Sequence, residues 1–159
     1  MEKKDQTSIE ELCELFVHVV NQYNALDKMP YSYGIGQKLH LSEVHTIDAI
    51  GKHDNINITK LAQYLNVTKG AVSQMVRKLV NKNLVIKSIS PETENEVVLS
   101  LTELGKQVYE GHQRFHKNLN KKIASLLAQQ PPGTIDILAT LSKELQKIWK
   151  EIEFEKNES

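Results

Sequence analysis

The sequence from Thr59 to Lys82 reads TKLAQYLNVTKGAVSQMVRKLVNK and contains two short helical patterns separated by three residues. The first pattern places its apolar side chains on one face, and Thr59 precedes it as a candidate N-cap. Asn66-Val67-Thr68 forms the turn, and Thr68 can cap a second helix over residues 69–82. Two short helices joined by a tight turn have the proportions of a helix-turn-helix.

The second helical pattern divides into an apolar and a polar face. The apolar face carries Val72, Met75, Val76, Leu79 and Val80. The opposite face carries Lys69, Gly70, Ser73, Gln74, Arg77 and Asn81. Because residues three and four apart share a helix face, we predict a helix that rests on a core through one side and presents a polar, basic surface on the other.

A β-hairpin is predicted directly after this pair of helices. Residues 84–89 and 96–101 are rich in β-branched side chains, and they flank the turn-forming tract 90–95. A hairpin that follows a helix-turn-helix gives the order of a winged helix. We therefore predict a mainly α fold with a small β-hairpin wing.

Amphipathic helices are predicted at both ends of the chain. A capping box of Ser8 and Glu11 begins the first helix, which covers residues 8–26. Thr102 begins the C-terminal helices, which cover residues 104–155. Their apolar stripes have no partner within the predicted winged helix, so these helices need another surface to cover them.

The composition excludes several classes of protein. The chain has 159 residues, of which 40% are apolar and 25% charged, as in an ordinary globular protein that needs no cofactor to fold. No apolar run approaches the roughly 18 residues of a membrane span, and the charged start lacks a signal-peptide pattern. A single cysteine, Cys13, excludes an internal disulfide and fits a reducing compartment. We expect a cytoplasmic protein with no membrane partner.

The charge is distributed unevenly along a chain whose net charge is zero. Residues 59–91 hold six basic and no acidic residues, whereas the balance is −4 in residues 1–58 and −4 again in residues 92–103. Residues 104–159 have a balance of +2. The positive block coincides with the predicted helix-turn-helix, and such coincidence is the electrostatic pattern expected of a DNA-binding protein.

The same part of the chain resembles the MarR family of winged-helix transcriptional regulators. The resemblance rests on Leu61-Ala62, Leu65 to Thr68, Ala71-Val72-Ser73, Leu79 and the LT-x-x-G pattern of Leu101 to Gly105. It implies a single MarR-like domain over residues 1–159, with a winged helix-turn-helix in residues 41–103 and dimerisation helices in residues 8–26 and 104–155. It also implies a homodimer that binds a pseudo-palindromic operator in double-stranded DNA and acts as a repressor.

The resemblance assigns individual residues to DNA. The recognition helix, residues 69–82, would enter the major groove. Base contacts are expected from Lys69, Gly70, Ser73 and Gln74, and Arg77 can reach a base or a phosphate. Thr59, Lys60 and Thr68 would hold phosphates, and Lys78 and Lys87 complete the predicted set.

The wing departs from the family pattern. The family commonly has Asp-x-Arg before the last strand, with the arginine in the minor groove, but this chain has Thr93-Glu94-Asn95 between Glu92 and Glu96. Lys87 is the only cation nearby. The chemistry of this tip does not favour contact with the minor groove.

Two histidines suggest a site for a metal effector. His112 and His116 are spaced i, i+4 on one helix face, and this spacing can chelate one Zn²⁺. The zinc-responsive branch of the family has HxxxH at the same distance after its LT, although its third ligand falls in a different register. The predicted ligands are His112, His116 and one or both of Glu43 and His45, and the alternative is a plain hydrogen-bonded cluster.

Other functions are weighed against this interpretation. A small aromatic ligand between the helical regions is another candidate effector. The peroxide-sensing branch of the family has a reactive cysteine near the start of its first helix, as Cys13 is here, but this chain has Val17 where that branch has a tyrosine, so a buried, inert thiol is expected. A metal-dependent hydrolase would need a third ligand and a general base in a pocket, but the sequence has no nucleophile motif, so we expect no enzyme. A helical dimerisation module that does not bind DNA would agree with the neutral charge and the acidic wing.

Overall fold

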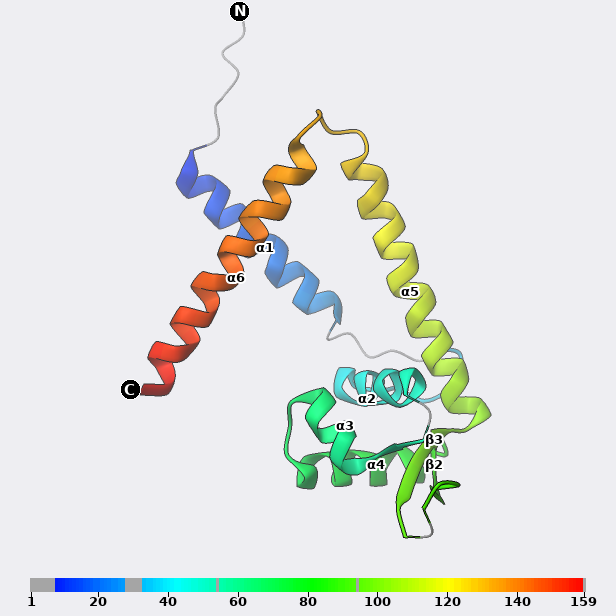
Figure 1. The fold of residues 1–159 in the computed structure, drawn as a ribbon. Helices are drawn as coiled ribbons and strands as arrows, with labels where there is room; N and C mark the ends of the chain where they lie inside the picture. Colours follow the sequence, from blue (N-terminus) through cyan, green and yellow to red (C-terminus); the bar gives the residue numbers. More distant parts are fainter. Residues whose placement is uncertain (1–7, 28–32, 54, 94, 159) are drawn as a thin grey trace, which may run out of the picture. The chain divides into compact units, whose positions relative to one another are not determined.

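The computed structural model describes residues 8–27, 33–53, 55–93 and 95–158. Its contacts divide the chain into two compact units, residues 1–113 and residues 114–159. The first unit contains α1 (Ile9–Asp27), α2 (Leu41–Lys52), β1 (Ile56–Asn57), α3 (Ile58–Leu65), α4 (Lys69–Asn81), β2 (Val85–Ile89), β3 (Val97–Leu101) and the start of α5 (Glu103–Leu127). The second contains the rest of α5 and α6 (Thr134–Glu158). The predicted mainly α fold with a β-hairpin wing is confirmed (Figure 1).

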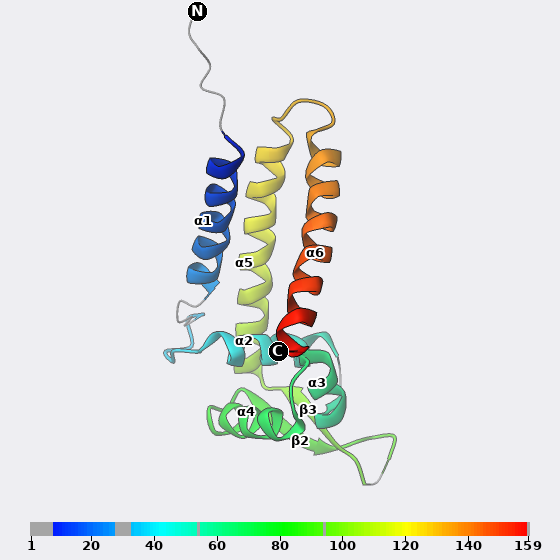
Figure 2. The ribbon, with the colours of Figure 1, turned by 90° about the vertical axis from the view of Figure 1, so that its left-hand side faces the viewer.

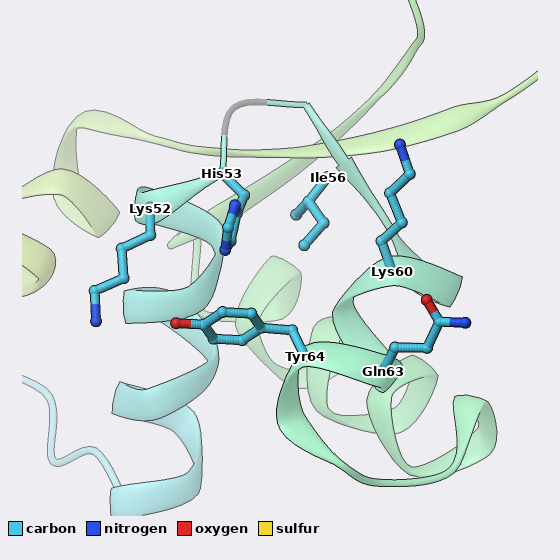
Figure 3. A pocket seen from close by; sticks show the side chains of 6 residues that line it. All are labelled: Lys52, His53, Ile56, Lys60, Gln63 and Tyr64. Carbon is cyan, nitrogen blue, oxygen red and sulfur yellow. The ribbon is translucent and has the colours of Figure 1, made fainter.

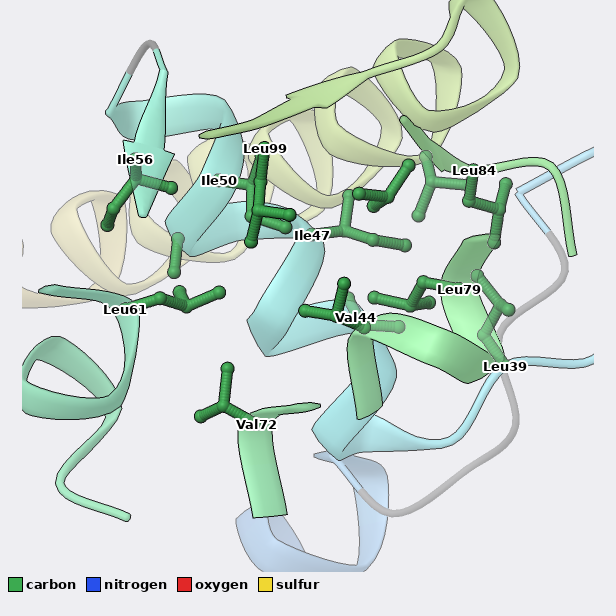
Figure 4. Packing of buried hydrophobic residues seen from close by; sticks show 14 of the residues in the cluster. Leu39, Val44, Ile47, Ile50, Ile56, Leu61, Val72, Leu79, Leu84 and Leu99 are labelled. Carbon is green, nitrogen blue, oxygen red and sulfur yellow. The ribbon is translucent and has the colours of Figure 1, made fainter. Parts of the chain in front are cut away.

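A single hydrophobic core lies beneath the two short helices and the sheet (Figure 4). Helix α2 packs against α3, α4 and β3, so it forms the centre of this core. Burial of one large aliphatic side chain contributes about 1.5–3 kcal/mol, which makes the core the main stabilising element of the first unit. The fully buried aliphatic side chains include Leu39, Val44, Ile47, Leu61, Val76, Leu79, Leu84, Leu99 and Val108.

The sheet has a third strand that the sequence patterns do not indicate. The strand order is β1-β3-β2, and both pairings are antiparallel. In β1, Ile56 lies opposite Leu99 and Asn57 opposite Val98. Two residues are too few to show an alternating pattern, so only the pairing with β3 defines this strand. Figure 2 shows the hairpin of β2 and β3 beside α3 and α4.

The N-cap of α4 lies at the predicted residue, whereas the N-cap of α3 does not. Thr59 is not the cap of α3, because Asn57 occupies that position and its Oδ1 accepts a hydrogen bond from the Lys60 N–H at 2.7 Å. Strand β1 ends at Asn57, so the chain turns into the helix two residues earlier than expected. Thr68 is the cap of α4 as predicted, and its Oγ1 accepts from the Ala71 N–H at 3.2 Å.

The LT-x-x-G pattern has a structural explanation at the start of α5. The Thr102 hydroxyl accepts a hydrogen bond from the Gly105 N–H at 2.9 Å and donates one to the Asn83 carbonyl oxygen at 2.8 Å. A Cβ on residue 105 would lie 2.0 Å from the carbonyl oxygen of Leu84. The threonine therefore caps the helix, and the glycine lets its first turn contact the backbone between α4 and β2.

Helices α1 and α6 each expose an apolar stripe in the single chain. The capping box at the start of α1 is confirmed, because Ser8 and Glu11 bond to each other's backbone N–H groups at 3.1 and 2.8 Å. Cys13 is exposed, so the expectation of a buried thiol is wrong for the single chain. The described part of the chain includes no helix both long and apolar enough to cross a membrane. The exposed apolar side chains include Leu12, Leu15 and Val19 of α1 and Leu138, Leu141 and Ile148 of α6.

We predict that Gly105→Ala destabilises the winged helix by about 3 kcal/mol, because the added methyl group meets backbone that cannot move aside cheaply. Urea unfolding followed by circular dichroism measures the change. Gly70→Ala is the matched control, since the nearest atom to its Cβ lies 4.0 Å away, and its stability should stay within about 1 kcal/mol of the wild type. Equal stability of both variants would contradict the packing role of Gly105.

Candidate nucleic-acid interface

The turn between α3 and α4 is closed by backbone hydrogen bonds. Asn66 adopts a left-handed conformation with φ of 53°, which asparagine tolerates better than most residues. The Asn66 N–H donates to the Gln63 carbonyl oxygen at 3.2 Å, and the Val67 N–H donates to that of Ala62 at 3.1 Å. The chain thereby ends α3 and reaches Thr68 in three residues, which sets the position of the second helix.

Helix α4 buries one face and leaves the other in solvent. Val72, Val76 and Leu79 are buried as predicted, with exposed fractions of 1%, 0% and 0%. Val80 is 36% exposed, so its assignment to the buried face is wrong. Its position is 80° around the helix from Val72 and lies at the edge of the apolar stripe, by the rotation of about 100° per residue.

The start of α4 adjoins an open hollow, here called the turn hollow, with a volume of about 430 Å³. The N–H groups in the first turn of a helix have no intrahelical acceptor and carry the positive end of the helix dipole. Oxygen atoms of a phosphate group fit such a place. The turn hollow is lined by Thr59, Ala62, Gln63, Asn66, Val67, Thr68 and Lys69.

The polar residues predicted to contact DNA lie on this surface. Lys60, Lys69, Gly70, Gln74, Arg77 and Lys78 are exposed, Thr68 is exposed at the mouth of the turn hollow, and Ser73 and Thr59 are partly buried. Within the described part of the chain, no ion pair engages Lys60, Lys69, Arg77, Lys78 or Lys87. Their charge is therefore available to a ligand in solution.

Lys82, the remaining cation of the positive block, has a different role. Its Nζ lies 2.6 Å from Oε1 of Glu43 and 3.4 Å from the carbonyl oxygen of Lys38. Oε2 of Glu43 accepts the His40 N–H at 2.9 Å, so the carboxylate also caps α2. This ion pair joins the end of α4 to the start of α2, and sequence reasoning missed it because the partners are 39 positions apart.

The Glu43 carboxyl is almost completely buried, with 3% exposure. Burial raises its pKa, but the hydrogen bonds from Lys82 and from the His40 backbone outweigh burial and hold the pKa below its ordinary value of 4.5. Glu43 is therefore ionised at neutral pH, and its two oxygens are already bound. A metal ion that bound Glu43 would compete with these two contacts.

The other predicted metal ligands are only partly brought together. The rings of His45 and His112 lie 5.9 Å apart between centroids, and Nδ1 of His112 lies 3.1 Å from the hydroxyl of Tyr33. His116 lies one turn further along α5, beyond the end of the first unit, with its ring 5.4 Å from that of Phe115. Among the residues that the structure describes, no three His, Cys, Asp or Glu side chains are placed to hold one metal ion.

One carboxylate of the acidic wing is bonded to the neighbouring strand β1. The side-chain amide of Asn57 donates a hydrogen bond to Oε1 of Glu96, which ties the wing to the cap of α3. Lys87 is exposed on β2 opposite Leu99. Glu92 is also exposed, and Glu94 lies outside the described residues.

Comparisons with known proteins agree with this architecture. Residues 39–95 match the model of the MarR family. The chain is 25% identical over 124 residues to YhjH of Bacillus subtilis (strain 168), an uncharacterized HTH-type transcriptional regulator, and the alignment covers 78% of this chain and 71% of YhjH.

Two solved structures share the fold. Streptococcus pneumoniae FabT, crystallised in complex with DNA, is 22% identical with a TM-score of 0.70, over 91% of this chain and 99% of FabT. Lactococcus lactis ZitR, described as a zinc-responsive MarR family member, is 17% identical with a TM-score of 0.72, over 89% of this chain and 99% of ZitR. At these identities the likeness supports a winged-helix fold of the MarR type.

We predict that Lys82→Met destabilises the protein by about 3 kcal/mol at pH 7, because a buried carboxylate loses its partner. The pKa of Glu43 is lowered in the folded state, so the pair stabilises above pH 4.5 and its contribution disappears as the pH falls through the folded-state value. Urea unfolding between pH 3 and pH 7 measures the difference from wild type. Lys78→Met, on the exposed side of α4, should change stability by less than about 0.5 kcal/mol, and a Lys82→Met effect that does not vary with pH would refute the ion-pair role.

Proposed function

We propose that this chain is a helix-turn-helix transcriptional regulator of the MarR family, which binds a pseudo-palindromic operator as a homodimer and represses transcription. Its relatives are regulators, and the chain is not an enzyme. The observation that carries the proposal is the exposed side of α4, where polar groups and cations that form no ion pair with any described residue lie around the start of the helix. A regulator of this kind would act in the cytoplasm.

The proposed contacts follow from the exposed groups. Lys69, Gly70, Ser73 and Gln74 would meet base edges in the major groove, with Arg77 beside them. The Lys60 ammonium, the hydroxyls of Thr59 and Thr68, and the first N–H groups of α4 would hold phosphates. Lys78 and Lys87 would add phosphate contacts at the edges of the site.

A homodimer accounts for the apolar stripes on the terminal helices. Leu15 of α1 is 55% exposed and Leu141 of α6 is 54% exposed, which is unusual for leucines at regular helical spacing. A two-fold dimer would cover each stripe with a second copy of the chain. It would also present two recognition helices to an operator with the same symmetry.

The expected result of Arg77→Ala is a loss of affinity for the operator of about tenfold or more. A gel-shift or fluorescence titration with the DNA upstream of the protein's own gene measures the affinity and the stoichiometry, which should be two chains per operator. Lys106→Gln is the matched control, because it removes one positive charge on α5, where Lys106 pairs with Glu103 at 2.6 Å. Unchanged binding by Arg77→Ala would remove α4 from the interface.

Zinc stays a candidate effector, with His112, His116 and one or both of Glu43 and His45 as its predicted ligands. ZitR is described as zinc-responsive, but in this chain the Glu43 carboxylate is bound by Lys82, and the described residues do not assemble three ligands. If these residues close around an ion, the purified protein retains about one zinc ion per chain after zinc loading and gel filtration, as measured by atomic emission, and His112→Ala abolishes it. Retention of much less than one ion per chain by the wild type would refute the ligand set.

A further inference from the structure

A second hollow lies beside the turn hollow along α3, and no DNA contact has been assigned to most of it. This flank hollow has a volume of about 740 Å³ and lies between the end of α2, strand β1 and the exposed side of α3. Figure 3 shows the Tyr64 ring between Lys52 and Lys60, with His53 and Ile56 above it. The described residues that line it are Lys52, His53, Ile56, Lys60, Gln63 and Tyr64.

The lining of the flank hollow favours an anion. It holds two ammonium groups, an imidazole, a phenol hydroxyl and a carboxamide, and its described lining includes no carboxylate. Asp48 accepts a hydrogen bond from Lys52 at 2.6 Å, and this bond raises the pKa of Lys52. The Lys52 ammonium therefore stays protonated, but the Asp48 carboxylate partly neutralises its charge. The stronger positive end is that of Lys60, which has no ion pair within the described residues.

The same lining also offers an apolar wall. The rings of His53 and Tyr64 are in edge-to-face contact with centroids 4.8 Å apart, and Ile56 lies beside them. A sugar ring can pack against such a surface, and a phosphate attached to it would reach the cations. The chemistry that fits is therefore a phosphodiester with its sugar.

The flank hollow is continuous with the predicted DNA surface. Gln63 lines both hollows, and the neighbouring residues Thr59 and Lys60 line one each. A DNA strand that leaves the turn hollow along α3 would pass Gln63 and enter the flank hollow. Both hollows are open at the surface, as a passing backbone requires.

We propose that the flank hollow binds a backbone phosphate of DNA outside the base pairs that α4 reads. The inference rests on the proposed function, because it needs the turn hollow and α4 to be on DNA. It extends the protein's footprint to Lys52, His53 and Tyr64, which sequence reasoning did not connect with DNA.

The test compares two duplexes with the full-length protein. One duplex ends at the inverted repeat of the operator, and the other carries several further base pairs on each side. Wild-type protein should bind the longer duplex more tightly, and His53→Glu should weaken that binding about fivefold while it leaves the short duplex unaffected. Lys52→Gln should lower the slope of log affinity against log salt by about 0.9 for each phosphate that the protein no longer neutralises.

Three controls separate the possible outcomes. Lys106→Gln changes the net charge by the same amount as either variant and should bind both duplexes like wild type. Urea unfolding shows whether loss of the Lys52–Asp48 pair alters the fold, and His53→Glu leaves that pair intact. Arg77→Ala tests the proposed function separately. Arg77→Ala could lose binding while His53→Glu and Lys52→Gln affect both duplexes equally. That result would show that α4 contacts DNA and that the flank hollow does not.

A free phosphate compound is the other source of the same chemistry. Titration of wild-type protein with inorganic phosphate, followed by the NMR signals of His53 and Tyr64, distinguishes the two sources. We expect no saturable shift at low millimolar phosphate, because a single anion lacks the sugar that the apolar wall contacts. Saturation without any effect of flanking DNA would overturn the proposal and assign the hollow to a free phosphate ligand.

Discussion

The candidate nucleic-acid interface depends on the burial of one face of a 13-residue helix, α4. Val72, Val76 and Leu79 hold α4 against the core, and their burial decides which of its other side chains remain in solvent. The helix cannot rotate about its axis without exposing these three residues, each worth roughly 1.5–3 kcal/mol. The position of Arg77 and Gln74 relative to the turn hollow is thus a consequence of hydrophobic packing.

A buried ion pair adds a second constraint at the far end of the same helix. Apolar contacts are non-directional, so the core by itself does not fix the exact placement of α4. The Lys82–Glu43 pair is directional and links the C-terminal end of α4 to the cap of α2. The pair also lowers the positive charge that residues 59–91 present to a ligand, because Lys82, one of their six cations, is neutralised by Glu43.

The net charge of the chain is zero, but its individual regions are not neutral. Cations that pair with no acidic group in the described ranges lie on the exposed sides of α3 and α4, whereas Glu96 is bonded to Asn57 and Glu43 is buried. An acidic wing and an acidic N-terminal region would weaken non-specific attraction to DNA, so affinity would rest on a small number of placed contacts. The two hollows that share Gln63 mark where such contacts can continue beyond the recognition helix.

The sequence alone determined the order of the elements, the cap at Thr68, the buried face of α4 and the positive block, because these depend on neighbours a few positions apart. Two-residue strand β1 escaped it, since this strand exists only through pairing with β3. The cap of α3 was placed at Thr59 instead of Asn57, although the Asn57 cap is a local hydrogen bond to Lys60. The role of Glu43 also escaped it, because its partner is distant in the chain. Only the tertiary structure brought together the Lys82–Glu43 pair and the flank hollow. Both are formed by residues of separate elements, and these elements become neighbours because α2 packs against α3 and α4.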